Sequence, residues 1–365
     1  MAEKFFAFEV SKVSIAFGLR YGLGDSVVAR KVFDALTEIE PDCKADIFYL
    51  EERHRIFAEA FFSDSKNLNR ILSREKFYEQ NVGRYDLSVW VVGTHCIIFD
   101  GANVEHMKIF APKLLQTALA IQEYNRKNIL NQGSLGMSVP LRNVAISRTF
   151  QKKFFYFLSC GGALPIHDEK INLPLAPDSK NFFDALKLGK YITIYSNITR
   201  LANTTVYSDT HRRAVIKPKA KAWPMKNLVE YVALVKKFFP ALEVVQVGGS
   251  DDTPIKNVDK KFLSCDLELT KYILANSLLH VGCEGGLIHL ATALGTKCLV
   301  LFGSSDWHYF GYEKNINLSA EICSPCMYIL EDYSCLRGQD EPPCMTSIAA
   351  DEVFKITREY LENKT

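Results

Sequence analysis

The residues with the clearest chemical potential in this chain of 365 residues are two adjacent glycines, Gly285 and Gly286. They follow the apolar run 278–281, which is typical of a buried strand, and they precede residues 287–294, whose apolar members recur at helical spacing. Backbone N–H groups at the head of such a helix, together with the positive end of its dipole, bind anions. A turn that merely connects two elements is the alternative interpretation, and the glycines alone do not decide between them.

Asp25 is a second candidate, and it follows Gly24 in the loop 20–25. The apolar run 13–17 predicts the first strand, and residues 26–36 are spaced as an amphipathic helix. Asp25 would then lie at the carboxyl end of a strand, which is where ligands collect in open α/β sheets. An Asp at this place also commonly serves as a helix N-cap, so it has a structural interpretation beside the chemical one.

Three further side chains suit a phosphorylated ligand. Lys221 ends the basic run 211–221, and its compact charge suits a diphosphate, although a solvated surface lysine has the same appearance. Asp251 and Asp252 follow a Gly-Gly pair at the end of the apolar run 243–247. Carboxylates there can accept hydrogen bonds from a ribose, but surface turns use the same residues.

Four of the ten cysteines share the spacing C-x2-C-x8-C-x8-C. Four thiolates can close a tetrahedral site for zinc or iron, while disulfides and four unligated thiols are the alternatives. The N-terminus has no pattern of a secretory signal, so we expect a reducing, cytoplasmic location, where disulfides are disfavoured. A structural staple is the expected role of the group, which comprises Cys323, Cys326, Cys335 and Cys344.

Composition and charge agree with a two-domain enzyme. A chain of this length with 48% hydrophobic residues can build two cores. Its formal net charge of +2 is scattered and gives no footprint for nucleic acid. No uncharged run reaches the ~18 residues that a transmembrane helix needs, and the longest candidate, 88–99, carries His95.

The elements that must position these residues alternate between strand and helix. Further strands are expected at 45–50, 87–92, 190–196 and 297–302, and helices at 110–128, 223–239, 267–277 and 349–361. Residues 51–80 are expected to form surface helices, and residues 131–150, with their glycines and Pro140, to form a loop. A domain change is expected near residues 174–189, where prolines and polar residues precede a new strand.

The run 283–303 resembles the signature of the bacterial heptosyltransferase family, glycosyltransferase family 9. The usual form is an acidic residue, a small residue, Gly, two apolar residues and His, and here Glu284, Gly285, Gly286 and His289 occupy the defining positions. The departures are Glu284, where Asp is commoner, and Gly285, where Thr or Ser is commoner. The resemblance implies that this turn faces the diphosphate of a nucleotide sugar. His289 would then hydrogen-bond the donor, or simply pack.

Three other stretches are similar to this family. Gly24 and Asp25 match a Gly-Asp pair whose carboxylate is the proposed catalytic base, and with this match Arg20, Gly22 and Gly24 form an acceptor-side loop. The run 221–224 matches Lys-x-Trp-Pro, whose lysine contacts the donor phosphate. The cysteine group is similar to one in the subgroup that glycosylates autotransporter proteins, which is described as holding iron.

The resemblance implies the GT-B fold, in which two Rossmann-like domains face each other across a cleft. We expect an N-terminal acceptor-binding domain at 1–178 and a C-terminal domain for the nucleotide sugar at 187–348, which includes the cysteine-rich segment 323–344. The terminal helix, within 349–365, is expected to cross back to the first domain. The resemblance covers most of the second half of the chain, and the first half mainly at its opening loop.

The function that the resemblance implies is inverting transfer of a heptose or related sugar from an ADP- or GDP-sugar to a hydroxyl group. No cofactor is then needed for catalysis, and structural zinc or iron is the only metal expected. The acceptor is left open among lipopolysaccharide core, capsule and protein, as is peripheral contact with a membrane. Alternatives are a nucleotide-sugar epimerase on the same fold, a non-catalytic nucleotide-sugar-binding protein, and a metal-stapled interaction module.

Overall fold

A computed structural model describes residues 13–20, 22–79, 84–129, 138–196, 205–207, 212–214, 219–323, 325–329 and 335–364. The N-terminal residues 1–12, and parts of the expected loop 131–150, of the basic run 211–221 and of the cysteine-rich segment, lie outside these ranges. The chain forms two compact units. Unit 1 comprises residues 1–131 and 156–168, and unit 2 comprises residues 132–155 and 169–365. The chain therefore passes between the units three times, at 131/132, 155/156 and 168/169, and all three passages come before the single boundary expected at 178–187.

The sheet of unit 1 has the strand order β3-β2-β1-β4-β5. Its strands are β1 Ser14–Leu19, β2 Lys44–Tyr49, β3 Leu68–Ser73, β4 Leu87–Val92 and β5 Cys96–Ala102. All neighbouring pairs are parallel except β4 and β5, which are antiparallel and joined by a short turn. The strand β1 is central and almost entirely buried, as its apolar sequence predicts.

The helices of unit 1 are α1 Leu23–Ile39, α2 Glu52–Phe62, α3 Arg74–Glu79, α4 Val104–Phe110 and α5 Pro112–Asn128. Phe17 of β1 packs edge-on against Phe33 of α1 with ring centroids 5.4 Å apart, and Phe62 of α2 completes this buried aromatic cluster. The single helix expected at 110–128 is interrupted at Ala111, because Pro112 begins a new helix at a position where no N–H is required. Residues 51–80 contain the strand β3 besides two helices.

The sheet of unit 2 has the order β10-β9-β6-β11-β12-β13, and all its pairs are parallel. Its strands are β6 Tyr191–Ile194, β9 Glu243–Gly248, β10 Lys260–Leu263, β11 His280–Cys283, β12 Cys298–Phe302 and β13 Ile316–Ser319. A separate antiparallel pair is formed by β7 Thr205–Tyr207 and β8 Arg212–Ala214. Numbered within the unit, the order is that of the doubly wound dinucleotide-binding fold. The predicted α/β class with Rossmann-like units is confirmed.

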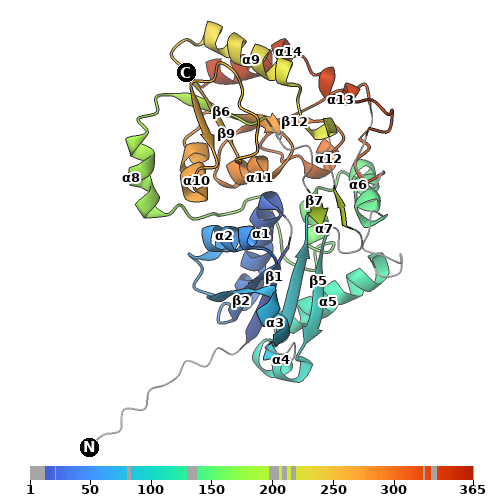
Figure 1. The fold of residues 1–365 in the computed structure, drawn as a ribbon. Coiled ribbons are helices and arrows are strands. Elements are labelled where there is room, and N and C mark those ends of the chain that lie inside the picture. The colour runs from blue at the N-terminus through green and yellow to red at the C-terminus, as the bar shows by residue number, and fades with distance from the viewer. Residues whose placement is uncertain are drawn as a thin grey trace, which may run out of the picture. The chain divides into compact units, whose positions relative to one another are not determined.

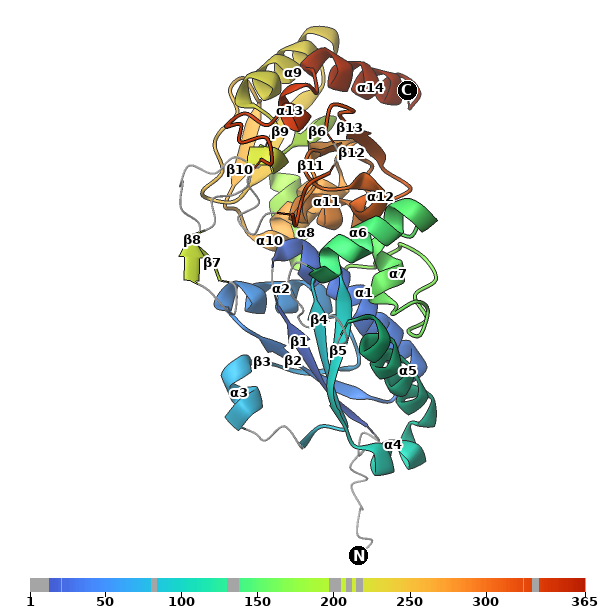
Figure 2. The same cartoon turned by 90° about the vertical axis from the view of Figure 1, so that its right-hand side faces the viewer.

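Unit 2 contains helices before, between and after the strands of its sheet. They are α6 Ser138–Phe150, α8 Pro177–Ala185, α9 Met225–Phe238, α10 Leu267–Ala275, α11 Gly286–Ala293, α12 Trp307–Phe310, α13 Pro343–Thr346 and α14 Ala350–Glu362. The 3-10 helix η3 Lys219–Lys221 precedes α9. The helix α7 Phe154–Leu158 lies where the chain passes between the units. The loop expected at 131–150 is wrong for its described part, because residues 138–150 form α6. This helix packs against α12 within unit 2 (Figure 2).

The terminal helix α14 packs beside α9 on one face of the unit 2 sheet, as Figures 1 and 2 show. Phe354 of α14 contacts Phe238 of α9 at a centroid distance of 5.0 Å, and Tyr231 hydrogen-bonds Thr357 at 2.9 Å. The apolar side of α14 is therefore buried in the core of unit 2, whereas this helix was expected to cross back to the first domain. Within the described part of the chain, no helix is both long and apolar enough to cross a membrane.

Candidate functional site

The strand order of unit 2 reverses direction between β6 and β11, and ligands of doubly wound sheets bind beyond the carboxyl ends of the strands at such a point. Glu284 follows β11 there, and Gly285 is the N-cap of α11. The N–H groups of Ile288 and His289 both reach the carbonyl of Gly285. Among the described residues, the N–H groups of Gly286 and Leu287 have no acceptor, so this helix head presents bare amide donors.

The backbone conformation at position 285 does not require a glycine. Its φ of 162° and ψ of −171° are extended, which any residue adopts. A Cβ built on it would meet nothing closer than the carbonyl oxygen of Cys283 at 3.9 Å. The Cβ of a larger residue would therefore fit here without rearrangement.

Lys221 and Glu284 form a buried ion pair beside this helix head. The Lys221 Nζ lies 2.5 Å from Glu284 Oε2, and the two side chains are only 17% and 8% exposed. Burial raises the pKa of Glu284, but the Lys221 ammonium, together with His289 and Ser305, lowers it by more, so the net shift is downward and the side chain is a carboxylate. Among the residues that the structure describes, Glu284 Oε2 has this ionic contact but no hydrogen-bond partner of good geometry. Lys221 and Glu284, which the sequence suggested separately as donor-binding residues, are thus in contact with each other.

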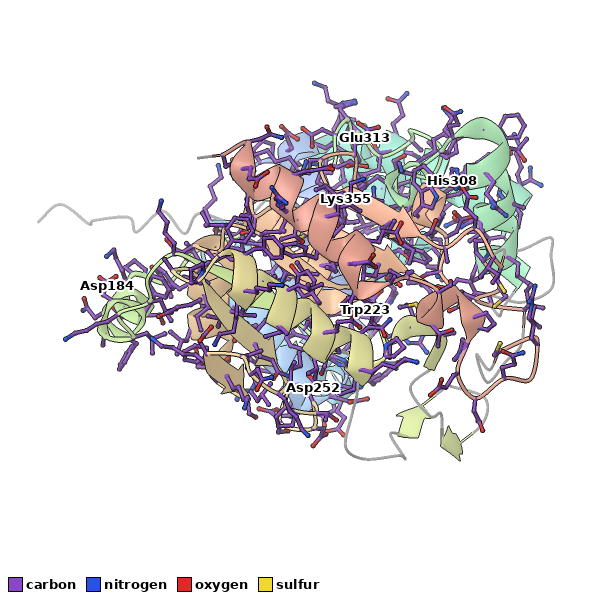
Figure 3. The ribbon with its side chains drawn as sticks, turned by 90° about the horizontal axis from the view of Figure 1, so that it is seen from above. Asp184, Trp223, Asp252, His308, Glu313 and Lys355 are labelled. Carbon is purple, nitrogen blue, oxygen red and sulfur yellow. The ribbon has the colours of Figure 1, made fainter. Side chains whose placement is uncertain are left out.

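The Trp-Pro sequence after Lys221 explains how the lysine is held. Trp223 is fully buried, its indole N–H donates to the Ile348 carbonyl at 2.9 Å, and Pro224 caps α9. The carbonyl of Ala220 accepts the Ser304 N–H at 3.0 Å. A Cβ on Gly303 would lie 2.1 Å from that carbonyl, so only glycine lets η3 approach the end of β12 this closely. Trp223, labelled in Figure 3, lies near α9 and α14.

His289 lies on the first turn of α11 and is 5% exposed. Its Nδ1 is 2.7 Å from the Tyr312 hydroxyl, and Phe154 meets its ring edge-on at 5.8 Å. Burial lowers the pKa of His289 to about 4, despite the opposing effect of the Glu284 carboxylate, so the imidazole is neutral near pH 7. His289 therefore packs in the core of unit 2 and hydrogen-bonds Tyr312, whereas a hydrogen bond to the donor stays a prediction.

Three members of the site were missed by sequence reasoning. The Ser305 side chain hydrogen-bonds the Glu284 carboxylate, Phe310 lies under the Lys221 ammonium at 5.9 Å from the ring centroid, and Tyr312 holds His289. All three follow β12, whose carboxyl end lies beside that of β11. The signal that could have found them is this position after a buried parallel strand.

The two aspartates expected to bind ribose have different surroundings from each other. Asp252, labelled in Figure 3, is buried, and its Oδ2 accepts the Gly249 N–H at 2.7 Å, which closes the turn after β9. Asp251 is exposed and lies 3.4 Å from the Ser250 hydroxyl. In the sheet one strand, β6, lies between β9 and β11, so the turn that carries both aspartates does not adjoin the turn before α11.

The cysteine-rich segment is attached to the same site. The N–H groups of Cys326 and Met327 both donate to the Ser304 carbonyl, at 3.0 and 2.9 Å. Burial raises the pKa of the Cys344 thiol to about 12, and the other three thiols of the group, when ionised, push it in the same direction. The four thiols are thus close enough to influence one another, and all ten cysteines are unpaired. Among the described residues, however, no three metal-binding side chains converge as a metal site.

Asp25 lies at the corresponding point of unit 1, where the strand order reverses between β1 and β4. It is the third residue of α1, and its Oδ2 accepts the N–H of the N-cap Gly22 at 3.2 Å. The interpretation of Asp25 as an N-cap is therefore wrong by three positions, because α1 begins at Leu23 rather than at Ser26. A carboxylate in the first turn also interacts favourably with the helix dipole.

The turn after β4 passes close to the Asp25 carboxylate at Gly93. Gly93 has a φ of +54°, and a Cβ built on it would lie 3.2 Å from Asp25 Oδ1 and 3.8 Å from His95 Cδ2. Burial lowers the pKa of His95 to about 4, so this side chain, which lies next to Gly93, is neutral near pH 7. Of the other expected acceptor-side residues, Gly24 is buried in α1 and Arg20 is partly buried just after β1. Sequence reasoning did not assign Gly93 or His95 to the site.

Comparisons with known proteins were informative only at the level of structure. No protein-family model matches the sequence, and no curated protein matches it. ADP-heptose lipopolysaccharide heptosyltransferase II of E. coli aligns with 97% of this chain and 100% of its own length, with a TM-score of 0.57 at 13% identity. A glycosyl transferase family 9 protein of Veillonella parvula aligns with 98% of this chain and 99% of its own length, with a TM-score of 0.55 at 12% identity.

A third similar structure is TibC of enterotoxigenic E. coli, described as a dodecameric iron-containing heptosyltransferase and solved with ADP-D-β-D-heptose. It aligns with 98% of this chain and 78% of its own, with a TM-score of 0.59 at 12% identity. These likenesses extend over nearly the whole chain. They confirm the predicted GT-B fold, and the resemblance to glycosyltransferase family 9 noted in the sequence is confirmed at the level of the fold.

Proposed function

We propose that this chain is an inverting glycosyltransferase of the heptosyltransferase kind, which moves a heptose or related sugar from a nucleoside-diphosphate sugar to a hydroxyl group. The observation that carries the proposal is the buried Lys221–Glu284 pair beside the bare amides of α11, at the switch point of a doubly wound sheet. The fold shared with heptosyltransferases, and the Gly-Gly-His signature at the same helix head, support it.

The departing group in this reaction is a nucleoside diphosphate, and its charge must be stabilised as the glycosidic bond breaks. The N–H groups of Gly286 and Leu287, the dipole of α11 and the Lys221 ammonium are the groups we assign to this task. Glu284 keeps the ammonium in place before the donor arrives, and its second oxygen is suited to a hydroxyl of the donor. We assign the nucleotide-sugar domain to unit 2.

We assign Asp25 as the general base that takes the proton from the acceptor hydroxyl. A base must be ionised and must reach that hydroxyl, and attack from the face opposite the leaving group then inverts the anomeric centre. Arg20, Gly22 and Gly24 belong to the acceptor side in this proposal, and Asp251 and Asp252 to the ribose side of the donor. The transfer requires both units to act on the same sugar.

The test uses Asp25→Asn, which keeps the shape and the hydrogen bond from Gly22 but removes the base. ADP-heptose is supplied with a panel of lipopolysaccharide core, capsular and protein acceptors, and donor binding is measured separately by thermal shift, because a ligand of the native state raises its stability. We expect unchanged donor binding and transfer reduced at least 100-fold. Transfer at the parent rate would remove Asp25 from the proposal, and donor turnover without any acceptor would indicate an epimerase.

We also propose that Cys323, Cys326, Cys335 and Cys344 hold a structural zinc or iron ion. Four sulfur donors suit either metal, and TibC is described as iron-containing. The metal takes no part in the transfer here; it would brace the segment that hydrogen-bonds Ser304 next to the Lys221 site. Elemental analysis of the purified protein tests this, with Cys335→Ser followed for folding and activity separately. A metal-free parent protein with full activity would refute the assignment.

A further inference from the structure

The hydrogen bond between Tyr312 and His289 connects two buried neutral groups. Tyr312 is 1% exposed and His289 5% exposed, and the hydroxyl lies 2.7 Å from Nδ1 of the imidazole. Phe154 meets both rings edge-on, at 5.8 Å for His289 and 5.6 Å for Tyr312, and Phe155 packs against Tyr312 at 6.0 Å. Both rings thus contact aromatic carbon, and among the described residues the Tyr312 hydroxyl hydrogen-bonds only His289.

This single partner determines which atom carries the proton. A neutral imidazole has one N–H, and a tyrosine hydroxyl has one proton. If Nδ1 carried the hydrogen and donated it to Tyr312, the hydroxyl proton would have no acceptor, since His289 is the only hydrogen-bond partner of the Tyr312 hydroxyl among the described residues. An unpaired buried donor is disfavoured by about tenfold or more. The favoured arrangement has Tyr312 donating to a bare Nδ1, with the imidazole hydrogen on Nε2.

The tautomer matters because it decides whether Nε2 of His289 can donate a hydrogen bond to a ligand. His289 belongs to the first turn of α11, beside the bare amides of Gly286 and Leu287 and within electrostatic reach of Glu284 and Lys221. Its Nε2 has no hydrogen-bond partner among the described residues. A phosphate oxygen only accepts hydrogen bonds, so a neutral histidine binds it with Nε2–H and repels it with a bare Nε2.

We propose that Tyr312 is a positioning residue: it fixes His289 in the Nε2–H tautomer, and so makes the buried imidazole an uncharged hydrogen-bond donor for the diphosphate of the donor. This inference rests on the proposed function for the identity of the ligand, but not for the tautomer itself. It assigns a role to a residue that lies 23 positions from its partner along the chain.

The tautomer is measured without any ligand. Nitrogen-15 NMR of histidine-labelled protein at pH 7.5, with His289 assigned by its loss in His289→Gln, distinguishes the two neutral forms. We expect His289 to be Nε2–H in the parent protein and to become a mixture or Nδ1–H in Tyr312→Phe. A parent His289 in the Nδ1–H form, or a tautomer unchanged by Tyr312→Phe, overturns the proposal.

A double-mutant cycle with ADP as the probe tests the consequence. Glutamine places an amide donor near the position of Nε2 and has no tautomer to fix, so Tyr312→Phe should weaken ADP binding about fivefold or more in the parent but less than twofold in the His289→Gln background. The matched control, Tyr231→Phe, removes another buried hydroxyl that bonds Thr357 in the core, and should leave ADP binding unchanged. Equal losses in both backgrounds would show a packing role for Tyr312 and overturn the proposal. If the parent binds neither ADP nor GDP, the proposed function fails, while the tautomer is still decided by the spectrum.

Discussion

Lys221 Nζ lies 2.5 Å from Glu284 Oε2 at the head of α11, and both side chains are largely shielded from water. A pair in this setting is a poor source of net stability, because burial of each charge offsets the attraction between them. Removing one partner is nevertheless costly, because the other charge then remains buried alone. The pair therefore complicates any mutational test of Lys221 as a phosphate ligand.

Replacing Lys221 alone should affect stability and binding together. We expect Lys221→Met to lower the free energy of unfolding by about 3 kcal/mol, through the unpaired Glu284 carboxylate, and to weaken ADP binding at least tenfold. Urea unfolding and calorimetric titration with ADP measure the two effects.

The double variant Lys221→Met with Glu284→Gln is the control that separates them. It should recover most of the lost stability, because neither charge is buried alone, and it should still bind ADP weakly. Recovery of ADP binding along with stability would show that Lys221 acts only as the partner of Glu284.

Gly285→Ser should be tolerated, and should strengthen the site. The backbone is extended there and an added Cβ has room, so the hydroxyl can cap α11 and contribute a few tenths of a kcal/mol to stability. The same hydroxyl adds a donor next to the amides of α11, and we expect tighter ADP binding by severalfold. Gly285→Ala supplies the Cβ without the hydroxyl and should bind ADP no better than the parent. Weaker binding by the serine variant would indicate that the ligand needs the space.

Gly93→Ala tests the assignment of Asp25 from the side of β4. Its φ of +54° costs an alanine about 1–2 kcal/mol, and the new Cβ would press on Asp25 Oδ1 from 3.2 Å. We expect sugar transfer to fall at least tenfold with unchanged ADP binding.

Gly162→Ala in the same unit is the matched control for this variant. Gly162 has a φ of +99° and nothing within 4 Å of an added Cβ, so this substitution has the backbone cost without contact to Asp25. Gly162→Ala should lose at least as much stability in thermal unfolding as Gly93→Ala, because a φ of +99° is less accessible to alanine, and only Gly93→Ala should lose activity. Equal activity losses would mean that the effect is one of folding.

Acid should destabilise the protein through His280 in β11. This side chain is fully buried beside Thr193, and burial lowers its pKa from 6.5 to about 3. The unfolded chain takes up a proton below about pH 6.5 and the folded chain does not, so stability falls as the pH is lowered through this window and the loss ends near pH 3. At about 1.4 kcal/mol per pH unit, the loss from His280 between pH 6.5 and 5 is about 2 kcal/mol. Urea unfolding of His280→Asn should show a correspondingly shallower dependence on pH; an unchanged slope contradicts the assignment.

Local sequence patterns were sufficient wherever the physical cause is local. The apolar runs before Asp25 and before Glu284 predicted buried strands, and the Gly-Gly-His spacing predicted the turn and the helix that follow. Their order predicted the α/β fold, because alternating strands and helices of this length pack well only as parallel layers. The exact start of α1 was not predicted, since the loop before Asp25 contains no strong signal for the beginning of a helix.

Tertiary structure decided what depends on contacts between distant parts of the chain. The pairing of Lys221 with Glu284 spans 63 positions, and it forms because Gly303 lets η3 approach the end of β12. The approach of Gly93 to Asp25, and of Tyr312 to His289, depends likewise on which strands become neighbours in each sheet. A sequence records the types of such residues, but burial, pKa and partner arise only when the strands assemble. The residues able to do chemistry were therefore recognisable from the sequence, whereas the contacts that set their charge and protonation were decided by the fold.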